Sequence, residues 1–401
     1  MNVITISREY GAGGGEVARR LAETLGWELL DRELLHRAAA IEHVPDAELE
    51  RLDEKALSMT DRMRLHPPHQ RYMHGLTEAA RQAAARGKVV LVGRGTRQLL
   101  GDIPDVFHLR LVAPLDWRVQ RMALREGWSM DKARARCLEV DRSRDRFTRY
   151  FFGPNSLQPE QYDLTANSDR VPLDDVAALV LELARPQEEE RRQVASEESS
   201  LLATRHSPLA TPRVLTLSRQ IGAGNSGFAL TLGLRLSLRV FDRELLEYEA
   251  VRLGVSEAEL EQVDEQPPGL WQRLRSGSLH HRYFEALEQL MKELAERGNV
   301  LLVGRGGNRF LRDRSDAFHV RLVAEMETRV RRVMEHRWLR EEGARQLVAQ
   351  SDSQRRRFHE SYFNCDWTDP LEYHLTVNSG RLGPAAVDLV AAAATRHWAR
   401  Q

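Results

Sequence analysis

The chain has 401 residues, of which 42% are hydrophobic and 29% are charged, and its formal net charge at pH 7 is zero. This length suits two domains rather than one core, and the neutral total does not indicate a nucleic-acid or membrane-surface binder. Two cysteines, Cys137 and Cys365, provide neither a disulfide framework nor the spacing of a metal site. The sequence has no signal-peptide pattern and no apolar run near 18 residues, so we expect a cytoplasmic protein without nucleic-acid or membrane partners.

An internal repeat organises the chain. Four motifs recur with a fixed offset of 211 positions: 6–13 at 217–224, 30–35 at 241–246, 91–95 at 302–306 and 107–113 at 318–324. We therefore predict two tandem copies, at 1–185 and 213–401, joined by a linker at 186–212 that is rich in charged residues and serine. Packing of the two copies against each other is an arrangement that such a duplication allows.

Strands and helices alternate in each copy. In the first, we predict strands near 3–7, 27–30, 89–93, 107–112 and 162–166, and helices near 15–25, 32–41, 70–86, 115–126, 130–148 and 173–184. This order predicts an α/β fold in which a parallel sheet of about five strands has helices on both faces. Ligands of such sheets bind at the carboxyl ends of the strands.

A glycine-rich loop follows the first strand of each copy. Between a strand and a helix, such a loop turns backbone N–H groups toward a phosphate, although a glycine cluster can also be only a flexible turn. The Walker A pattern requires lysine and a hydroxyl residue, but their places hold Gly14 and Gly15 in the first copy. The candidate phosphate-binding residues are Gly11, Ala12, Gly13, Gly14 and Gly15, with Gly222, Ala223, Gly224, Asn225 and Ser226 in the second copy.

Two charged residues beside each loop are candidates for catalysis. Arg8 and Arg219 end the strand before the loop, where a guanidinium can replace the missing lysine or, alternatively, pair with a nearby carboxylate. Asp31 and Asp242 follow the second strand. Each can serve only as a helix cap, or it can orient an acceptor hydroxyl, accept its proton or hold Mg²⁺ through water.

Further arginines indicate an acceptor site and a lid. Arg94 and Arg305 lie between glycines after a buried strand, where they can meet an anion. Arg71 and Arg282, beside Tyr72 and Tyr283, either line an acceptor pocket or pack. Helices after the fourth strand carry an arginine series that is either a lid over the phosphates or a solvated face. It comprises Arg118, Arg121, Arg134, Arg144 and Arg146, with Arg329, Arg332, Arg345, Arg355 and Arg357, and we assign Arg144 and Arg355 a catalytic role.

These motifs resemble the cytidylate kinase-like family of P-loop nucleotide kinases. The resemblance rests on 6–14, 30–35, 92–95 and 162–168 and covers both copies apart from the linker. It implies ATP and Mg²⁺ as cofactors and a nucleoside monophosphate such as CMP as the acceptor, held by Arg94 or Arg305. The sequence departs from the family where Gly95 and Gly306 replace an aspartate, and where Asp31-Arg32-Glu33 replaces an Asp-Ser/Thr-Gly run.

Three functions stay open on this evidence. The leading one is ATP-dependent phosphoryl transfer to a nucleoside monophosphate, and if only one copy is active we expect the second, which retains Ser226. One alternative is a kinase that acts on a hydroxyl group, similar to dephospho-CoA kinases, with Asp31 as the base. The other is a nucleotide-binding sensor without kinase activity.

Overall fold

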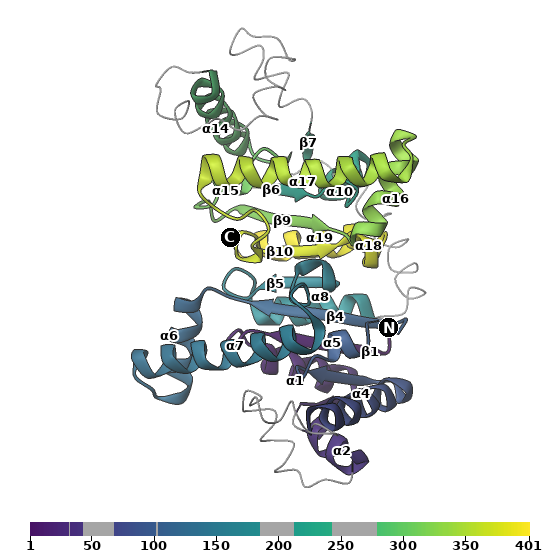
Figure 1. The fold of residues 1–401 in the computed structure, drawn as a ribbon. Coiled ribbons are helices and arrows are strands. Elements are labelled where there is room, and N and C mark those ends of the chain that lie inside the picture. The colour runs from purple at the N-terminus through teal and green to yellow at the C-terminus, as the bar shows by residue number, and fades with distance from the viewer. Residues whose placement is uncertain (32, 43–67, 102, 185–211, 243–278) are drawn as a thin grey trace, which may run out of the picture. The chain divides into compact units, whose positions relative to one another are not determined.

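The computed structural model describes residues 1–31, 33–42, 68–101, 103–184, 212–242 and 279–401. The chain forms two compact units, Met1–Pro186 and Gln187–Gln401. In Figure 1 the first unit runs from purple to blue-teal and the second from teal to yellow. Most of the predicted linker at 186–212 lies outside the described residues, as do Arg32, Arg243 and Glu244.

The first unit is built on five parallel strands. They are β1 (Val3–Arg8), β2 (Glu28–Leu30), β3 (Val89–Val92), β4 (Val106–Val112) and β5 (Leu164–Asn167). Their spatial order is β2-β3-β1-β4-β5, with Val3 opposite both Val89 and Val106. All four residues of β3 are buried, as expected of an apolar strand in a parallel sheet that is covered on both faces.

Helices cover both faces of this sheet. They are α1 (Gly14–Leu25), α2 (Glu33–Glu42), α4 (Pro68–Arg86), α5 (Thr96–Leu99), α6 (Leu115–Glu126), α7 (Met130–Phe152) and α8 (Leu173–Ala184), with the short turn η2 (Pro159–Gln161). The helices α1 and α8 pack together, and α2 packs against α4. The spacing of Val17, Ala18 and Leu21 gives α1 one buried face, because residues three and four apart share a side of a helix.

The second unit repeats this architecture. Its strands are β6 (Val214–Arg219), β7 (Arg239–Phe241), β8 (Val300–Val303), β9 (Ala317–Val323) and β10 (Leu375–Asn378), in the spatial order β7-β8-β6-β9-β10. Its helices are α10 (Ser226–Leu236), α14 (Leu279–Arg297), α15 (Gly307–Phe310), α16 (Met326–Arg337), α17 (Glu341–Phe363), α18 (Ser379–Leu382) and α19 (Ala385–Trp398), with η3 (Pro370–Glu372). The predicted α/β fold with two kinase-like parallel sheets is confirmed.

One helix is longer than the sequence pattern predicts. We expect it to end near residue 148, but α7 continues to Phe152. Its last turn is held by aromatic contacts, since Phe147 meets Tyr72 edge to face at 5.9 Å between ring centroids and also contacts Phe151 at 4.9 Å. These aromatic contacts stabilise a further helical turn after the polar part of α7, where the sequence pattern predicts that the helix ends. In the described parts of the chain, every helix is too short or too polar to cross a bilayer.

Candidate phosphate-binding site

The candidate site of the first unit lies at the carboxyl ends of its central strands. Arg8 is the last residue of β1, Asp31 follows β2, and Gly93-Arg94-Gly95 follows β3. The parallel sheet brings these three segments to one edge, as the sequence predicts. They surround the loop that joins β1 to α1.

The glycine loop adopts a conformation that requires glycine. Gly11 and Gly13 have φ angles of 85° and 91°, in the left-handed region. A Cβ atom at Gly13 would also lie 2.5 Å from Leu173 Cδ1. Within the described residues, the N–H groups of Gly13, Gly14 and Gly15 have no hydrogen-bond partner. The loop and the first turn of α1 therefore present free donors to an anion.

Arg8 fills the space beside the position of the Walker A lysine. A Cβ atom at Gly14 would lie 2.8 Å from both Cβ and Cγ of Arg8. At Gly15, by contrast, an added Cβ atom would meet nothing within 4 Å. A side chain at position 14 would therefore meet the stem of Arg8, whereas the second unit has Asn225 beside Arg219 at the corresponding position.

The guanidinium of Arg8 is held between Asp31 and the turn after β3. Its Nη2 atom donates a hydrogen bond to Asp31 Oδ1 at 3.3 Å, and a Cβ atom at Gly93 would overlap its Nη1 atom. Burial lowers the pKa of Arg8, and the charge of Asp31 opposes this shift. Arg8 therefore pairs with a nearby carboxylate, which is the alternative role given for it above. Its role in binding an anion stays a prediction.

Arg94 occupies a strained turn. Gly93, Arg94 and Gly95 all have positive φ angles, of 74°, 57° and 71°. The same three angles in the second unit are 76°, 54° and 72°, with Arg305 in the middle. A left-handed conformation costs a residue with a side chain about 1–2 kcal/mol, and such strain is concentrated at functional sites. The turn therefore supports the predicted role of Arg94 and Arg305 in binding an anion.

Arg144 is the one residue of the predicted lid series in the first unit that contacts the strand-end arginine. Its Nη1 atom donates a hydrogen bond to the backbone oxygen of Arg8 at 3.2 Å. Burial lowers the pKa of Arg144 to about 9, and repulsion from Arg8 and Arg94 contributes to this shift. The guanidinium group of Arg144 thus lies close enough to those of Arg8 and Arg94 to be repelled by them, and the stem of Arg8 lies beside Gly14 at the start of α1.

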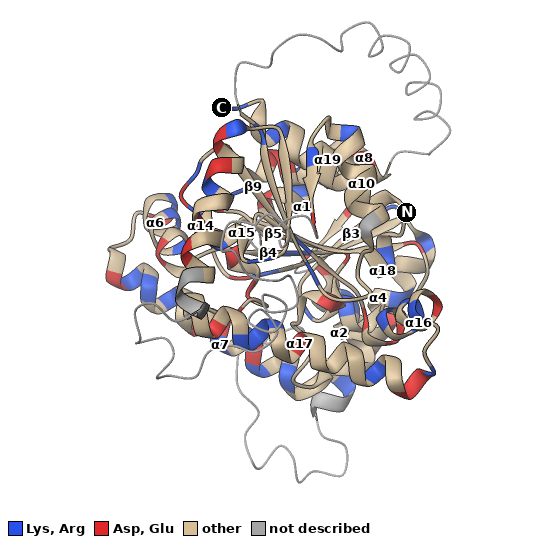
Figure 2. Cartoon of the chain, turned by 90° about the horizontal axis from the view of Figure 1, so that it is seen from above, with Lys and Arg blue, Asp and Glu red and all other residues tan. Residues whose placement is uncertain are grey.

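The other lid arginines brace the loop or lie in solvent. Arg118 donates to the carbonyl oxygen of Tyr10 at 3.0 Å and pairs with Asp141, while Arg121 donates to the carbonyl oxygen of Gly11 at 3.0 Å. Arg134 pairs with the exposed Asp116, and Arg146 is exposed. Bands of basic residues along α7 and α17 are visible in Figure 2. The arginine series of the first unit therefore has three kinds of member. Arg118 and Arg121 hydrogen-bond to the loop, Arg134 and Arg146 are exposed, and Arg144 contacts Arg8.

The second unit repeats this arrangement with a different loop. Arg219 Nη2 donates to Asp242 Oδ2 at 2.8 Å, and Arg355 donates to the backbone oxygen of Arg219. Burial, followed by repulsion from Arg219, lowers the pKa of Arg355 to about 10. Asn225 accepts a hydrogen bond from the N–H of Phe228 at 3.1 Å and caps α10. Its amide is neutral and cannot supply the charge of the Walker A lysine.

On the helix before the third strand, Arg71 contacts the end of α2, and its predicted acceptor role stays a prediction. Arg71 Nη2 donates to the carbonyl oxygen of Glu42 at 2.7 Å and ties α4 to the end of α2. Tyr72 and Tyr283 are buried in the cores, so they pack as the alternative reading proposed. The side chains of Arg282 and Ser226 lie outside the described residues, and their roles stay predictions.

The sequence analysis did not identify the residue that follows each strand-end arginine, Glu9 in the first unit and Gln220 in the second. Glu9 Oε2 accepts a hydrogen bond from the N–H of Ala113 at 3.0 Å, and Gln220 Oε1 accepts one from Ala324 at 3.1 Å. Burial raises the pKa of Glu9, which Arg118 opposes. The signal in the sequence was the polar residue that directly follows each strand-end arginine.

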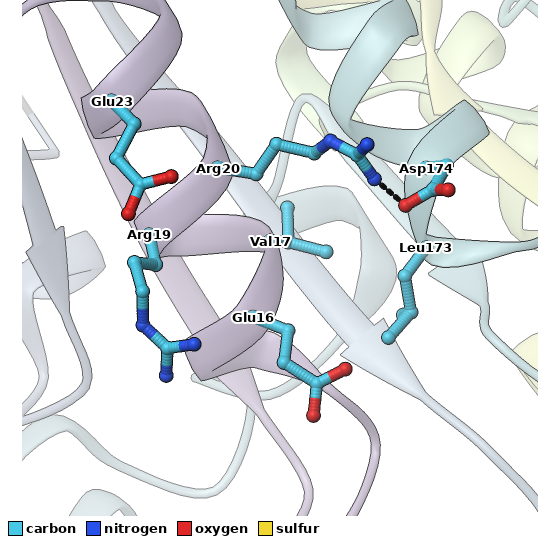
Figure 3. Close-up of a pocket in the computed structure, with 7 residues that line it drawn as sticks. All are labelled: Glu16, Val17, Arg19, Arg20, Glu23, Leu173 and Asp174. Carbon is cyan, nitrogen blue, oxygen red and sulfur yellow. Dashed lines mark ion pairs between the residues drawn. The ribbon is translucent and has the colours of Figure 1, made fainter.

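A surface hollow of about 310 Å³ lies between α1 and α8 of the first unit (Figure 3). Charged side chains surround Val17 and Leu173, and Arg20 forms an ion pair with Asp174. Glu16, at the edge of the hollow, pairs with Arg121. The hollow thus contains both basic and acidic side chains, two of which form the ion pair of Arg20 with Asp174.

Comparisons with known proteins give one family and several individual similarities. The sequence pattern of the Cytidylate kinase-like family matches residues 3–170 and 214–381. The cytidylate kinase of Methanopyrus kandleri is 27% identical over 176 residues, which cover 42% of this chain and 85% of that enzyme. A uronate isomerase of Corynebacterium glutamicum is 30% identical over 93 residues, but the match spans only 23% of this chain and 18% of that protein. The shikimate kinase of Acinetobacter baumannii, solved with shikimate, is 19% identical with a TM-score of 0.29 over 46% of this chain and 93% of that one.

Proposed function

The chain belongs to the cytidylate kinase-like family, and from this premise we propose that its units transfer a phosphoryl group from ATP to a nucleoside monophosphate such as CMP. An oxygen of the acceptor phosphate attacks the γ-phosphorus of ATP in line and forms the new P–O bond. The bond from the γ-phosphorus to the bridging oxygen breaks, and ADP leaves. Such transfer requires positioning and charge stabilisation rather than a covalent intermediate.

The observation that carries this proposal is the crowding of guanidinium groups around the free donors of the loop. Arg8 and Arg144 are in contact through a backbone hydrogen bond, and each has a lowered pKa because burial disfavours its charge. A polyphosphate among these groups would offset both the burial and the repulsion. The same arrangement at Arg219 and Arg355 supports an equivalent role in the second unit.

Each residue then has a distinct part. The N–H groups of Gly13, Gly14 and Gly15 bind phosphate oxygens of ATP, and Arg8 takes the place of the Walker A lysine. Arg94 binds the acceptor phosphate from its strained turn, and Arg144 stabilises the negative charge of the transferring group. Gly222 to Ser226, Arg219, Arg305 and Arg355 have the corresponding parts in the second unit.

Mg²⁺ is the cofactor that the family implies for ATP. It prefers carboxylate oxygens, phosphates and water, and in an octahedral site it retains several waters. The described residues contain no cluster of three or more ligating side chains, so the ion would take most of its ligands from phosphates and water. Asp31 and Asp242, beside the strand-end arginines, fit a contact with the ion through water.

Turnover by the full chain tests the proposal. ADP release is measured with ATP–Mg²⁺ and a panel of nucleoside monophosphates. We expect one acceptor to support release, and expect Arg8→Ala combined with Arg219→Ala to reduce it at least a hundredfold. The matched control is Arg142→Ala with Arg356→Ala, exposed residues of α7 and α17. Undiminished turnover in the Arg8/Arg219 double variant would refute the assignment.

A sensor without kinase activity is the second candidate, and the observation that favours it is the lack of a lysine at the loop. Among the described lysines, Lys88 is exposed before β3, Lys132 stacks on Trp128, and Lys292 pairs with Glu288. Tight ATP binding with no product from any acceptor would identify the sensor. A kinase that acts on a hydroxyl group would instead lose turnover, with binding retained, in Asp31→Asn combined with Asp242→Asn.

A further inference from the structure

We propose that the two units are unequal polyanion sites and that the second binds a polyphosphate more tightly. Two carboxylates that flank the loop of the first unit, Glu9 and Glu16, are replaced by Gln220 and Gly227 in the second. This inference rests on the proposed binding of phosphates at the loops. It adds which unit is the stronger site and which residues set the difference.

Glu9 and Gln220 have the same structural role with different charges. Glu9 accepts a hydrogen bond from the N–H of Ala113 at 3.0 Å, and Gln220 accepts one from the N–H of Ala324 at 3.1 Å. The backbone N–H of each also donates to the strand beside it, at 3.1 Å in both units. The amide therefore retains the geometry and removes one negative charge.

The arginine behind each loop has a different charge balance in the two units. Arg118 lies between two carboxylates. Its Nε atom is 3.4 Å from Glu9 Oε2, and its Nη1 atom is within hydrogen-bond distance of Asp141 Oδ2. Its counterpart Arg329 makes two hydrogen bonds to Asp352, at 2.8 and 2.7 Å. The arginine of the first unit thus meets one more carboxylate than its counterpart, and Arg110 also faces Glu9.

The next arginine along the helix differs in the same direction. Arg121 Nη2 lies 2.5 Å from Glu16 Oε2. Arg332 instead donates to neutral oxygens: the Gly222 carbonyl at 3.1 Å, Ser379 Oγ at 3.1 Å and the Ser379 carbonyl at 3.0 Å. Its charge beside the loop is not balanced by a carboxylate in these contacts.

Five pairs of charged residues at the two sites are of the same type at positions 211 apart. They are Arg8 and Arg219, Asp31 and Asp242, Arg94 and Arg305, Asp141 and Asp352, and Arg144 and Arg355. At these two positions beside the loop the second unit therefore has two fewer negative charges, while Glu325, which stands where the first unit has Pro114, pairs with Arg381 at 3.4 Å. A like charge several ångströms from a bound phosphate weakens binding by about tenfold at low ionic strength, and salt reduces the effect.

Single-site variants of the full chain isolate the two units. Arg8→Ala leaves the second site, and Arg219→Ala leaves the first. Each is titrated calorimetrically with inorganic tripolyphosphate at low and high salt. We expect the chain with Arg8→Ala to bind at least about tenfold more tightly than the chain with Arg219→Ala, with a steeper salt dependence. Equal affinities in the two chains would overturn the inference.

A reciprocal exchange of the two residues tests the cause. In the chain with Arg219→Ala, Glu9→Gln should tighten binding about tenfold at low salt. In the chain with Arg8→Ala, Gln220→Glu should weaken it to a similar extent. Glu23→Gln, an exposed change on α1, is the control and should have little effect. If both exchanges leave the affinity for tripolyphosphate unchanged, the role of Glu9 is overturned and the proposed function is not affected. If tripolyphosphate binds to none of these chains, both the inference and the proposed function are overturned.

Discussion

Arg144 donates a hydrogen bond from Nη1 to the backbone oxygen of Arg8 at 3.2 Å, so two positively charged residues meet at the edge of the sheet. Replacement of Arg144 by methionine should raise the free energy of unfolding by about 1–4 kcal/mol, because it removes a buried and repelled charge. It should also remove the increase in Tm that tripolyphosphate causes in the first unit. Thermal unfolding with and without tripolyphosphate, in a chain with Arg219→Ala, measures both effects.

The matched control for this change is Arg142→Met, which alters an exposed arginine on the same helix. It should leave the ligand-induced increase in Tm unchanged. A chain with Arg144→Met that still gains as much Tm from tripolyphosphate would show that Arg144 does not contact the anion.

Adjacent glycines in the loop should respond oppositely to alanine. Gly15→Ala enters open space in the first turn of α1 and should stabilise the unit by up to about 1 kcal/mol, because alanine favours the helix. Gly14→Ala places a methyl group against the stem of Arg8 and should destabilise it by about 1–3 kcal/mol. Urea denaturation of the two variants measures the difference, and equal effects would contradict the steric argument.

Arg94→Gly should separate stability from binding. The left-handed φ of 57° suits glycine, so the variant should gain about 1 kcal/mol in its free energy of unfolding while its affinity for the acceptor nucleotide falls. Lys88→Gly is the control, since Lys88 has a φ of 53° and is exposed before β3. It should gain similar stability and retain affinity. A loss of affinity in both variants would assign the effect to the backbone.

The stability of the second unit should depend on pH through His359. Burial and the nearby Arg309 and Arg355 lower the pKa of His359 to about 4, against 6.5 in the unfolded chain. The unfolded chain binds more protons between these values, so stability should rise from pH 4 to pH 6.5 and then level off. The total change is about 3 kcal/mol.

Denaturation at pH 5 and pH 7.5 checks this dependence. His359→Thr is the matched variant because Thr148 occupies the corresponding buried position in the first unit. It should remove most of the slope, whatever its effect on stability at pH 7.5. An unaltered slope would place the titrating group elsewhere.

The fold was largely predictable from sequence because its signals are local and occur twice. The buried strand β3 is a continuous apolar run, and α1 has apolar residues at helical spacing. The site was only partly predictable. The positions of Arg8, Asp31 and Arg94 follow from the ends of parallel strands, but the contact of Arg144 with Arg8 joins residues 136 positions apart. The bracing of the loop by Arg118 likewise depends on packing that periodicity does not encode.

The space shared by Gly14 and Arg8 also constrains how such a loop can evolve. A side chain at position 14 would meet the stem of Arg8, but Asn225 lies at the corresponding position of the second unit, in the same chain as Arg219. The two copies thus retain the strand-end arginine while the loop position beside it changes, and the loop of the first unit accepts a side chain at position 14 only if the stem of Arg8 moves.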